Sequence, residues 1–285
     1  MKNKKIQHLL ILNFAMLCLC TSGPLGRFIS LPPPLIIWYR AFLALLFIGL
    51  FCWWKKYDFS FDVKKYGWTI FFAGVFMAGN FVCYFYALQW SNVAIGMLAL
   101  FTFPVMTTLL EPLFFKTKFQ GIHLLLGGLI VVGIYFLAPT FDMESNMTKG
   151  LLIGLVSAFS WSLRNLLLKK TIANFNSSIL MFYQLLVVMV LLFPVLFIYQ
   201  AEEVRSQLPY LLFLGLVTTA IGHTLFMHTF NYFSVSTASI LASTQPIYGI
   251  IVALLVLGEI PSGRSLIGGA IILLTVFIEG RRSLR

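Results

Sequence analysis

The sequence predicts an all-α membrane protein with ten transmembrane helices, arranged as two inverted five-helix repeats. Two observations predict the helices. First, the chain is 60% hydrophobic and only 10% charged, whereas soluble domains carry about 25% charged residues. Second, apolar stretches long enough to cross a ~30 Å hydrocarbon core recur along the chain. A third observation predicts the repeats, because two parts of the chain separated by about 140 residues share one pattern.

The expected spans follow one another closely, which leaves no room for a soluble catalytic domain. The first span follows three lysines, but it is too long, and too closely followed by further spans, for a cleaved signal peptide. The ten expected spans cover about 6–28, 33–54, 66–88, 93–115, 119–138, 149–169, 177–199, 208–230, 235–257 and 262–280.

The basic residues are distributed unevenly across the expected membrane. With a cytoplasmic N-terminus, fourteen Lys and Arg residues fall on the cytoplasmic side and four on the outer side. This is the bias of the positive-inside rule. We therefore expect a multi-pass protein of the cell (inner) membrane, embedded in the lipid bilayer, with both termini in the cytoplasm. A nucleic-acid partner is not expected, because no basic face with interleaved aromatic residues lies outside the spans.

The sequence offers no catalytic or cofactor-binding pattern. It contains no Cys-x-x-Cys or His-Glu-x-x-His metal motif, and no Gly-x-x-x-x-Gly-Lys-Ser/Thr loop for ATP. The three aspartates, Asp58, Asp62 and Asp142, all fall in expected loops. We therefore expect no metal, no cofactor and no enzymatic activity.

The repeat is visible where residues 84–105 are compared with residues 226–247. Each passage contains the end of one span, a short turn and a second span with a proline inside it. Pro104 and Pro246 are 142 residues apart. Because each repeat has an odd number of spans, the second must begin on the opposite side of the membrane. Such inverted repeats are common in secondary transporters, whose substrate site lies at the repeat interface near the midplane.

Several motifs follow one another in a specific order and spacing along the chain. They are the Arg40 span, the turn Ser91-Asn92-Val93-Ala94-Ile95-Gly96 before Pro104, the run Ser236-Thr237-Ala238-Ser239 before Pro246, and Leu257-Gly258-Glu259 before Gly268-Gly269. With these motifs the whole chain resembles the EamA family of the drug/metabolite transporter superfamily. One departure is Phe115-Lys116-Thr117-Lys118, where the family usually closes its fourth span with Gly-Glu.

The resemblance implies a ten-helix carrier, commonly an exporter of amino acids or other small metabolites. Its two repeats would be residues 1–141 and 148–281. We expect a secondary, ATP-independent transporter that works by alternating access on a small-molecule substrate, as a monomer or a homodimer. The alternative is a flippase for a lipid-linked headgroup, which requires a groove open to lipid rather than an enclosed cavity.

The two prolines mark the first candidates for the substrate site. Pro104 and Pro246 lie ~16 Å into their spans, close to the midplane, at 1.5 Å per residue. Each proline removes a backbone hydrogen bond and frees a carbonyl group that needs a partner at this depth. We expect Thr244 and Gln245 to join Pro246 in the site. The alternative is a kink that serves packing only.

Arg40 is a charged residue about 10 Å deep in its span. Burying arginine at the centre of a membrane costs ~2.5–3.5 kcal/mol on insertion scales, so a function is expected. Arg40 either binds an anionic group, such as a substrate carboxylate, through two parallel hydrogen bonds, or it holds the turn at Leu31–Pro34 through backbone carbonyls. The related position of the second repeat, Gln184, is polar and neutral and is also a candidate for the site.

The remaining candidates are polar residues at various depths. Asn80 and Tyr84 share one helix face, and we expect them either to line the cavity or to form interhelical hydrogen bonds. His223 is a candidate for proton coupling because its ordinary pKa lies near 6.5. Glu111, near the cytoplasmic end, is either interfacial or involved in coupling. We expect Arg164 to extend toward the cytoplasmic boundary.

Overall fold

The computed structural model describes residues 2–60, 62–115, 121–137, 142–169, 171, 175–199, 204–233 and 242–283. Within these residues every regular element is a helix, which confirms the all-α prediction. The resemblance motifs at 116–118 and 236–239, and residues 235–241 of the ninth expected span, lie outside the described residues.

The expected first repeat contains seven described helices. Two of its expected spans are each built from two consecutive helices, α1 with α2 and α5 with α6. The bounds are α1 Lys2–Cys20, α2 Ser22–Phe28, α3 Pro33–Trp54, α4 Val63–Trp90, α5 Val93–Leu100, α6 Phe103–Phe115 and α7 Ile122–Leu137.

The expected second repeat is more interrupted, and one of its helices changes type along its length. The bounds are α8 Asn146–Leu168, α9 Ser177–Leu192, α10 Val195–Ile198, α11 Val204–Phe213, the π-helix η2 Leu214–His223, α12 Thr224–Thr229, the 3₁₀ turn η3 Ala242–Thr244, α14 Gln245–Leu257 and α15 Gly263–Ser283.

Seven helical segments of the described chain are long and apolar enough to cross a membrane. The other three expected spans correspond to shorter apolar helices at Leu125–Leu137, Gln245–Leu257 and Gly263–Ile278. The count of ten spans therefore stays a prediction, and so does the division into residues 1–141 and 148–281.

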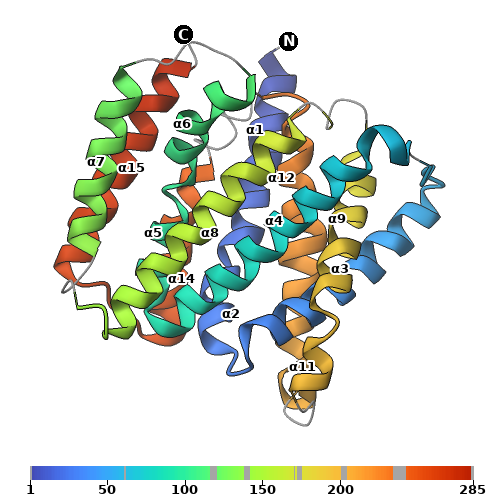
Figure 1. Cartoon of the computed structure of the whole chain (residues 1–285), viewed down its shortest axis with the longest axis horizontal. Helices are drawn as coiled ribbons and strands as arrows, with labels where there is room; N and C mark the ends of the chain where they lie inside the picture. The colour runs from blue at the N-terminus through green and yellow to red at the C-terminus, as the bar shows by residue number, and fades with distance from the viewer. Residues whose placement is uncertain are drawn as a thin grey trace.

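The helices run between two opposite ends of the molecule. α1 begins and α15 ends at the same end (Figure 1), which we call the terminal end. α8, the first helix of the second repeat, begins at the opposite or far end, where α2 also lies (Figure 1). The two repeats therefore enter the bundle from opposite ends, as the inverted arrangement requires.

Helix packing follows the duplication. α3 packs against α9 and α7 against α15, and each of these pairs joins corresponding spans of the two repeats. α4 crosses the centre of the molecule against α8 (Figure 1), and its counterpart η2 packs against α1. The interface between the repeats is thus made chiefly by the first three spans and the fifth span of each.

Glycines allow α8 to lie very close to its neighbours. A Cβ atom on Gly154 would lie 2.7 Å from Cβ of Ala99, and one on Gly150 would lie 3.1 Å from the carbonyl oxygen of Ala87. Membrane helices associate through such close packing because lipid provides no hydrophobic force between them. The α8 glycines therefore position the first span of the second repeat against α4 and α5.

The two prolines lie at corresponding breaks in the helices. α5 ends at Leu100, and Pro104 is the second residue of α6. Pro246 is likewise the second residue of α14, directly after the turn η3. Proline in a first helical turn has no intrahelical N–H partner to lose, so each proline starts a helix after a break rather than kinking a continuous one. The predicted interruptions are present in both repeats.

A first prediction concerns the glycine contact. Gly154→Ala should lower the free energy of unfolding in lipid–detergent micelles by about 1–3 kcal/mol, because the added methyl group overpacks a tight interface. The control is Gly128→Ala on α7, where an added Cβ meets no atom within 4 Å. Thermal unfolding of the two variants checks this, and equal stability of both would contradict the packing argument.

Candidate functional site

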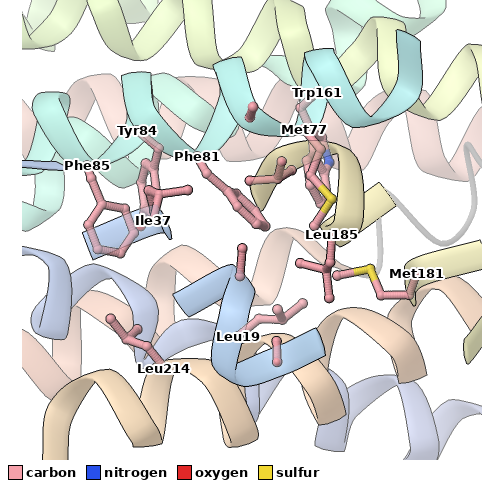
Figure 2. Close-up of a cluster of buried hydrophobic side chains, with 14 of the residues drawn as sticks. Leu19, Ile37, Met77, Phe81, Tyr84, Phe85, Trp161, Met181, Leu185 and Leu214 are labelled. Carbon is pink, nitrogen blue, oxygen red and sulfur yellow. The ribbon is translucent and has the colours of Figure 1, made fainter. Parts of the chain in front are cut away.

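A cavity of about 40 Å³ lies at the centre of the bundle, where the repeats meet. Figure 2 shows part of its apolar surroundings, including Phe81 and Tyr84 of α4, Trp161 of α8 and Leu19 of α1. This volume accommodates ordered water but no metabolite. Its polar lining residues are Ser22, Arg40, Asn80, Tyr84, His223 and Gln245.

Arg40 lies at the wall of this cavity and is 1% exposed. Its Nε donates to Oγ1 of Thr219 at 2.5 Å and Nη1 donates to Oγ of Ser22 at 3.3 Å. Its Nη2 lies 3.2 Å from Nε2 of His223, and the guanidinium carbon is 4.2 Å from the centre of the Phe81 ring. None of these partners is a carboxylate.

The alternative in which Arg40 holds the Leu31–Pro34 turn is not what the structure shows. Gln89 binds there instead, with Nε2 donating to the carbonyl oxygens of Ile29 at 3.1 Å and Leu31 at 2.9 Å. Arg40 is therefore free of this turn, and its guanidinium belongs to the cavity.

The π-helix η2 positions two of the partners of Arg40. A π-helix pairs residues five apart, and such segments are frequent at functional sites. Thr219 donates from Oγ1 to the carbonyl oxygen of Leu214 at 2.8 Å while it accepts from Arg40. His223 follows four residues later and reaches the same guanidinium. No residue pattern in the sequence predicts this helix type.

Two buried donors of the cavity have no partner in the described structure. Because a guanidinium can only donate, a hydrogen bond in this contact requires Nε2 of His223 to accept, and the ring then carries its proton on Nδ1. This Nδ1 and the hydroxyl of Tyr84 are both unpaired and buried. Leaving such a group unpaired costs about 1–3 kcal/mol. A ligand with acceptor oxygens would satisfy both.

Asn80 and Gln245 combine cavity lining with interhelical bonds. Nδ2 of Asn80 donates to the carbonyl oxygen of Ser157 at 3.1 Å and to its Oγ at 2.9 Å, and this Oγ donates back to the carbonyl oxygen of Asn80 at 2.9 Å. Nε2 of Gln245 donates to the carbonyl oxygen of Leu19 at 3.3 Å. The two alternatives considered for Asn80 therefore both hold.

Arg164 was expected at the cytoplasmic boundary, and this expectation is wrong. The residue is 2% exposed, and its Nε donates to Oε1 of Gln184 at 2.8 Å. Its guanidinium carbon lies 4.8 Å from the centre of the Trp161 ring. The expectation rested on the position of Arg164 close to the predicted membrane boundary, which a long basic side chain can reach. In the structure, the amide oxygen of Gln184 on α9 instead holds the side chain inside the protein.

Gln184 therefore lies beside the cavity rather than in its lining. It forms a second arginine bond that corresponds to the first, since Arg164 is 142 residues after Ser22 and Gln184 is 144 residues after Arg40. The repeat spacing identified Gln184 as the counterpart of Arg40, but it did not identify the pairing of Gln184 with Arg164.

The other candidates take different positions. Pro104 and Pro246 are buried beside the lining residues Phe103 and Gln245, and Thr244 is the residue before Gln245. Glu111 lies on α6 near the terminal end of the molecule. Lys169 donates to its carboxylate there, and Glu111 does not line the cavity.

The described residues contain no group of three or more His, Cys, Asp or Glu side chains arranged to hold a metal ion. The site is thus a cationic, aromatic-walled cavity between two repeats of membrane-length helices, and these features define a polytopic membrane protein of the transporter class. The model of the EamA-like transporter family matches the sequence twice, at residues 7–138 and 148–279. The chain belongs to this family, which is part of the drug/metabolite transporter superfamily.

Similar proteins agree with this assignment. An uncharacterized transporter of Archaeoglobus fulgidus is 29% identical over 220 residues, which cover 77% of this chain and 79% of that protein. An uncharacterized transporter of Haemophilus influenzae is 22% identical over 222 residues, covering 76% of this chain and 72% of that protein. A solved crystal structure, 18% identical, superimposes with a TM-score of 0.67 over 97% of this chain and 98% of its own, which supports the fold.

A second prediction tests the Arg164 bond. Gln184→Leu should lower the free energy of unfolding by about 1.5–3 kcal/mol, because a buried guanidinium loses a hydrogen-bond acceptor. The double variant Arg164→Met with Gln184→Leu should recover most of this loss, since apolar residues replace both partners. Thermal unfolding in micelles measures both effects, and a single variant as stable as the parent protein would contradict the prediction.

Proposed function

We propose that this chain is a secondary transporter that exports a small metabolite with a carboxylate group, such as an amino acid, by alternating access. The observation that carries the proposal is the buried guanidinium of Arg40 at a cavity between the repeats, with no acidic residue among the described residues that line it. Such a charge attracts an anion strongly because the surrounding dielectric is low.

The proposed substrate carboxylate binds Arg40 through two parallel hydrogen bonds. It displaces the weak contact with Ser22, which is 3.3 Å long, and its oxygens meet the unpaired donors of Tyr84 and His223. The aromatic wall of Phe81, Phe101 and Trp161 encloses the rest of the molecule. Binding sites for small molecules usually measure about 300–1,000 Å³, so the repeats must move apart before a substrate enters.

His223 is the proposed coupling residue. Its Nε2 accepts from Arg40, and this nitrogen cannot accept a hydrogen bond and carry a proton together. Protonation would end the bond and release one edge of the guanidinium. Proton binding and substrate binding would therefore depend on one another, which gives a gradient-driven carrier its coupling. His223→Gln should remove this dependence.

The proposed setting is the inner membrane, with both termini in the cytoplasm and the far end outside. The excess of basic residues at the terminal end supports this orientation. We propose a monomer or a homodimer in the lipid bilayer, with a small-molecule substrate and no nucleic-acid partner. Neither the family nor the curated relatives support the alternative of a lipid-headgroup flippase.

A third prediction tests the function and its direction. Cells that overproduce the protein should raise a small set of carboxylate-bearing metabolites in the medium and lower them in the cytoplasm. Arg40→Ala should abolish the change at equal abundance in the membrane. Arg205→Ala, which removes an exposed arginine on α11, is the matched control and should behave as the parent protein. Metabolite profiling of both compartments is the measurement.

The outcomes of this profiling are distinct. The same metabolites rising in the cytoplasm would reverse the proposed direction. An unchanged profile would contradict small-metabolite export. Equal activity of Arg40→Ala would remove Arg40 from the site.

A fourth prediction concerns the unpaired hydroxyl group of Tyr84. Tyr84→Phe should raise the KM for the substrate so identified by about 10-fold or more, because a hydrogen bond to a charged group contributes roughly 1.5–3 kcal/mol. Stability should not fall, since the hydroxyl has no partner in the described structure. Tyr210→Phe, an exposed tyrosine on α11, is the control. An unchanged KM would place the substrate elsewhere.

A further inference from the structure

Two ion pairs lie at opposite ends of the molecule. At the far end, Nε of Arg27 donates to Oε1 of Glu259 at 3.0 Å. At the terminal end, Lys169 donates to the carboxylate of Glu111. The central cavity lies between these two ends.

The two ion pairs are related by the repeat. Arg27 lies in α2, at the end of the first span, and Lys169 follows α8, the first span of the second repeat, 142 residues later. Their partners lie at the ends of the fourth spans, Glu259 after α14 and Glu111 in α6. In each pair, the base belongs to one repeat and the acid to the other.

This relation also explains the departure at the end of the fourth span. The position that corresponds to Glu259 by the 142-residue spacing is Thr117, which has no carboxylate. Glu111, six residues earlier on α6, supplies the acid instead. The ion pair is therefore retained at the terminal end although the motif is not.

The two ion pairs are also alike in burial. The side chains of Arg27 and Glu259 are 37% and 24% exposed, and those of Lys169 and Glu111 are 36% and 22% exposed. Pairs this accessible to solvent are worth little stability, about 0–1 kcal/mol. They can therefore form and break in a working cycle without unfolding the protein.

The ion pair at the far end connects several helices. Oε2 of Glu259 accepts from the backbone N–H of Val93 at 2.9 Å, in the first turn of α5. Nη1 of Arg27 donates to the carbonyl oxygen of Gln89, near the end of α4, at 2.6 Å. One carboxylate thus connects the first and fourth spans of one repeat to the end of the fourth span of the other, and Arg27 connects this pair to the third span. Separation of the repeats at this end requires both bonds of the carboxylate to break.

We propose that Arg27–Glu259 and Lys169–Glu111 are the two latches of the transport cycle, one closing the cavity at the far end and the other at the terminal end. Both ion pairs are formed in this structure. Opening toward either side breaks the latch at that end and leaves the other intact. The inference rests on alternating access, the mode of transport proposed above, but not on the identity of the substrate. It gives Glu111 a gating role in place of proton coupling.

The test measures how accessible the cavity is from each side. A reporter cysteine replaces the lining residue Ala242 in a chain whose four native cysteines are changed to serine. A membrane-impermeant maleimide labels it from outside in whole cells and from the cytoplasmic side in inside-out vesicles. Glu259→Gln should raise labelling from outside by about two- to fivefold, the change that an exposed ion pair allows, and Glu111→Gln should raise labelling from the cytoplasmic side instead.

Two controls make the result specific. Glu144→Gln breaks the ion pair between Glu144, just before α8, and Lys149 in the first turn of α8, at 3.7 Å. This pair does not join the two repeats, so its loss should leave both labelling rates unchanged. The charge-exchanged variants, Arg27→Glu with Glu259→Arg and Lys169→Glu with Glu111→Lys, should return labelling to the parent rates. Thermal unfolding of each variant confirms that it is folded.

The outcomes separate the latches from the transport function. The proposal of two latches is rejected if Glu259→Gln and Glu111→Gln raise labelling from the same side. It is also rejected if neither variant raises labelling although both are folded. Opposite changes in labelling without any transported metabolite would retain the latches and reject the proposed metabolite export.

Discussion

The structure depends on holding the positive charge of Arg40 inside the membrane. The guanidinium of Arg40 has five N–H donors and cannot lose its proton, so the surrounding helices must supply acceptors. They do so with Ser22 from α2 and with Thr219 and His223 from η2, while the Phe81 ring of α4 lies over the guanidinium. These elements come from both repeats, so one side chain on α3 orients the helices that form the cavity.

The π-helix is a local consequence of this requirement. The hydroxyl of Thr219 donates to the carbonyl oxygen of Leu214, which leaves its lone pairs directed at Arg40. An α-helical turn would give the same hydroxyl a carbonyl three or four residues back. The wider turn thus brings a hydroxyl and an imidazole, four residues apart, to one guanidinium. None of these groups is an acid, so the charge is hydrogen-bonded but not cancelled.

The sequence predicted the features that depend on residue type along one helix. The apolar spans, the proline breaks at Pro104 and Pro246, and the burial of Arg40 each follow from the membrane as a solvent. The pairing of polar groups between helices could not be predicted in this way. Gln184 as the acceptor for Arg164, and Ser157 as the partner of Asn80, depend on which helix faces which, and neutral partners leave no charge pattern in the chain.

The comparison of the two repeats shows why the site carries a single accessible charge. In the first repeat the arginine lies on the second span and its hydroxyl partner, Ser22, on the first. In the second repeat the arginine, Arg164, lies on the first span and its amide partner, Gln184, on the second. Both repeats thus keep a bond between their first two spans, but the arginine and its partner have exchanged spans. As a result Arg164 lies outside the cavity lining, while Arg40 lies within it. A symmetric pair of arginines at the cavity would favour a dianion, whereas this divergence leaves one guanidinium, which matches the single carboxylate of the proposed substrate.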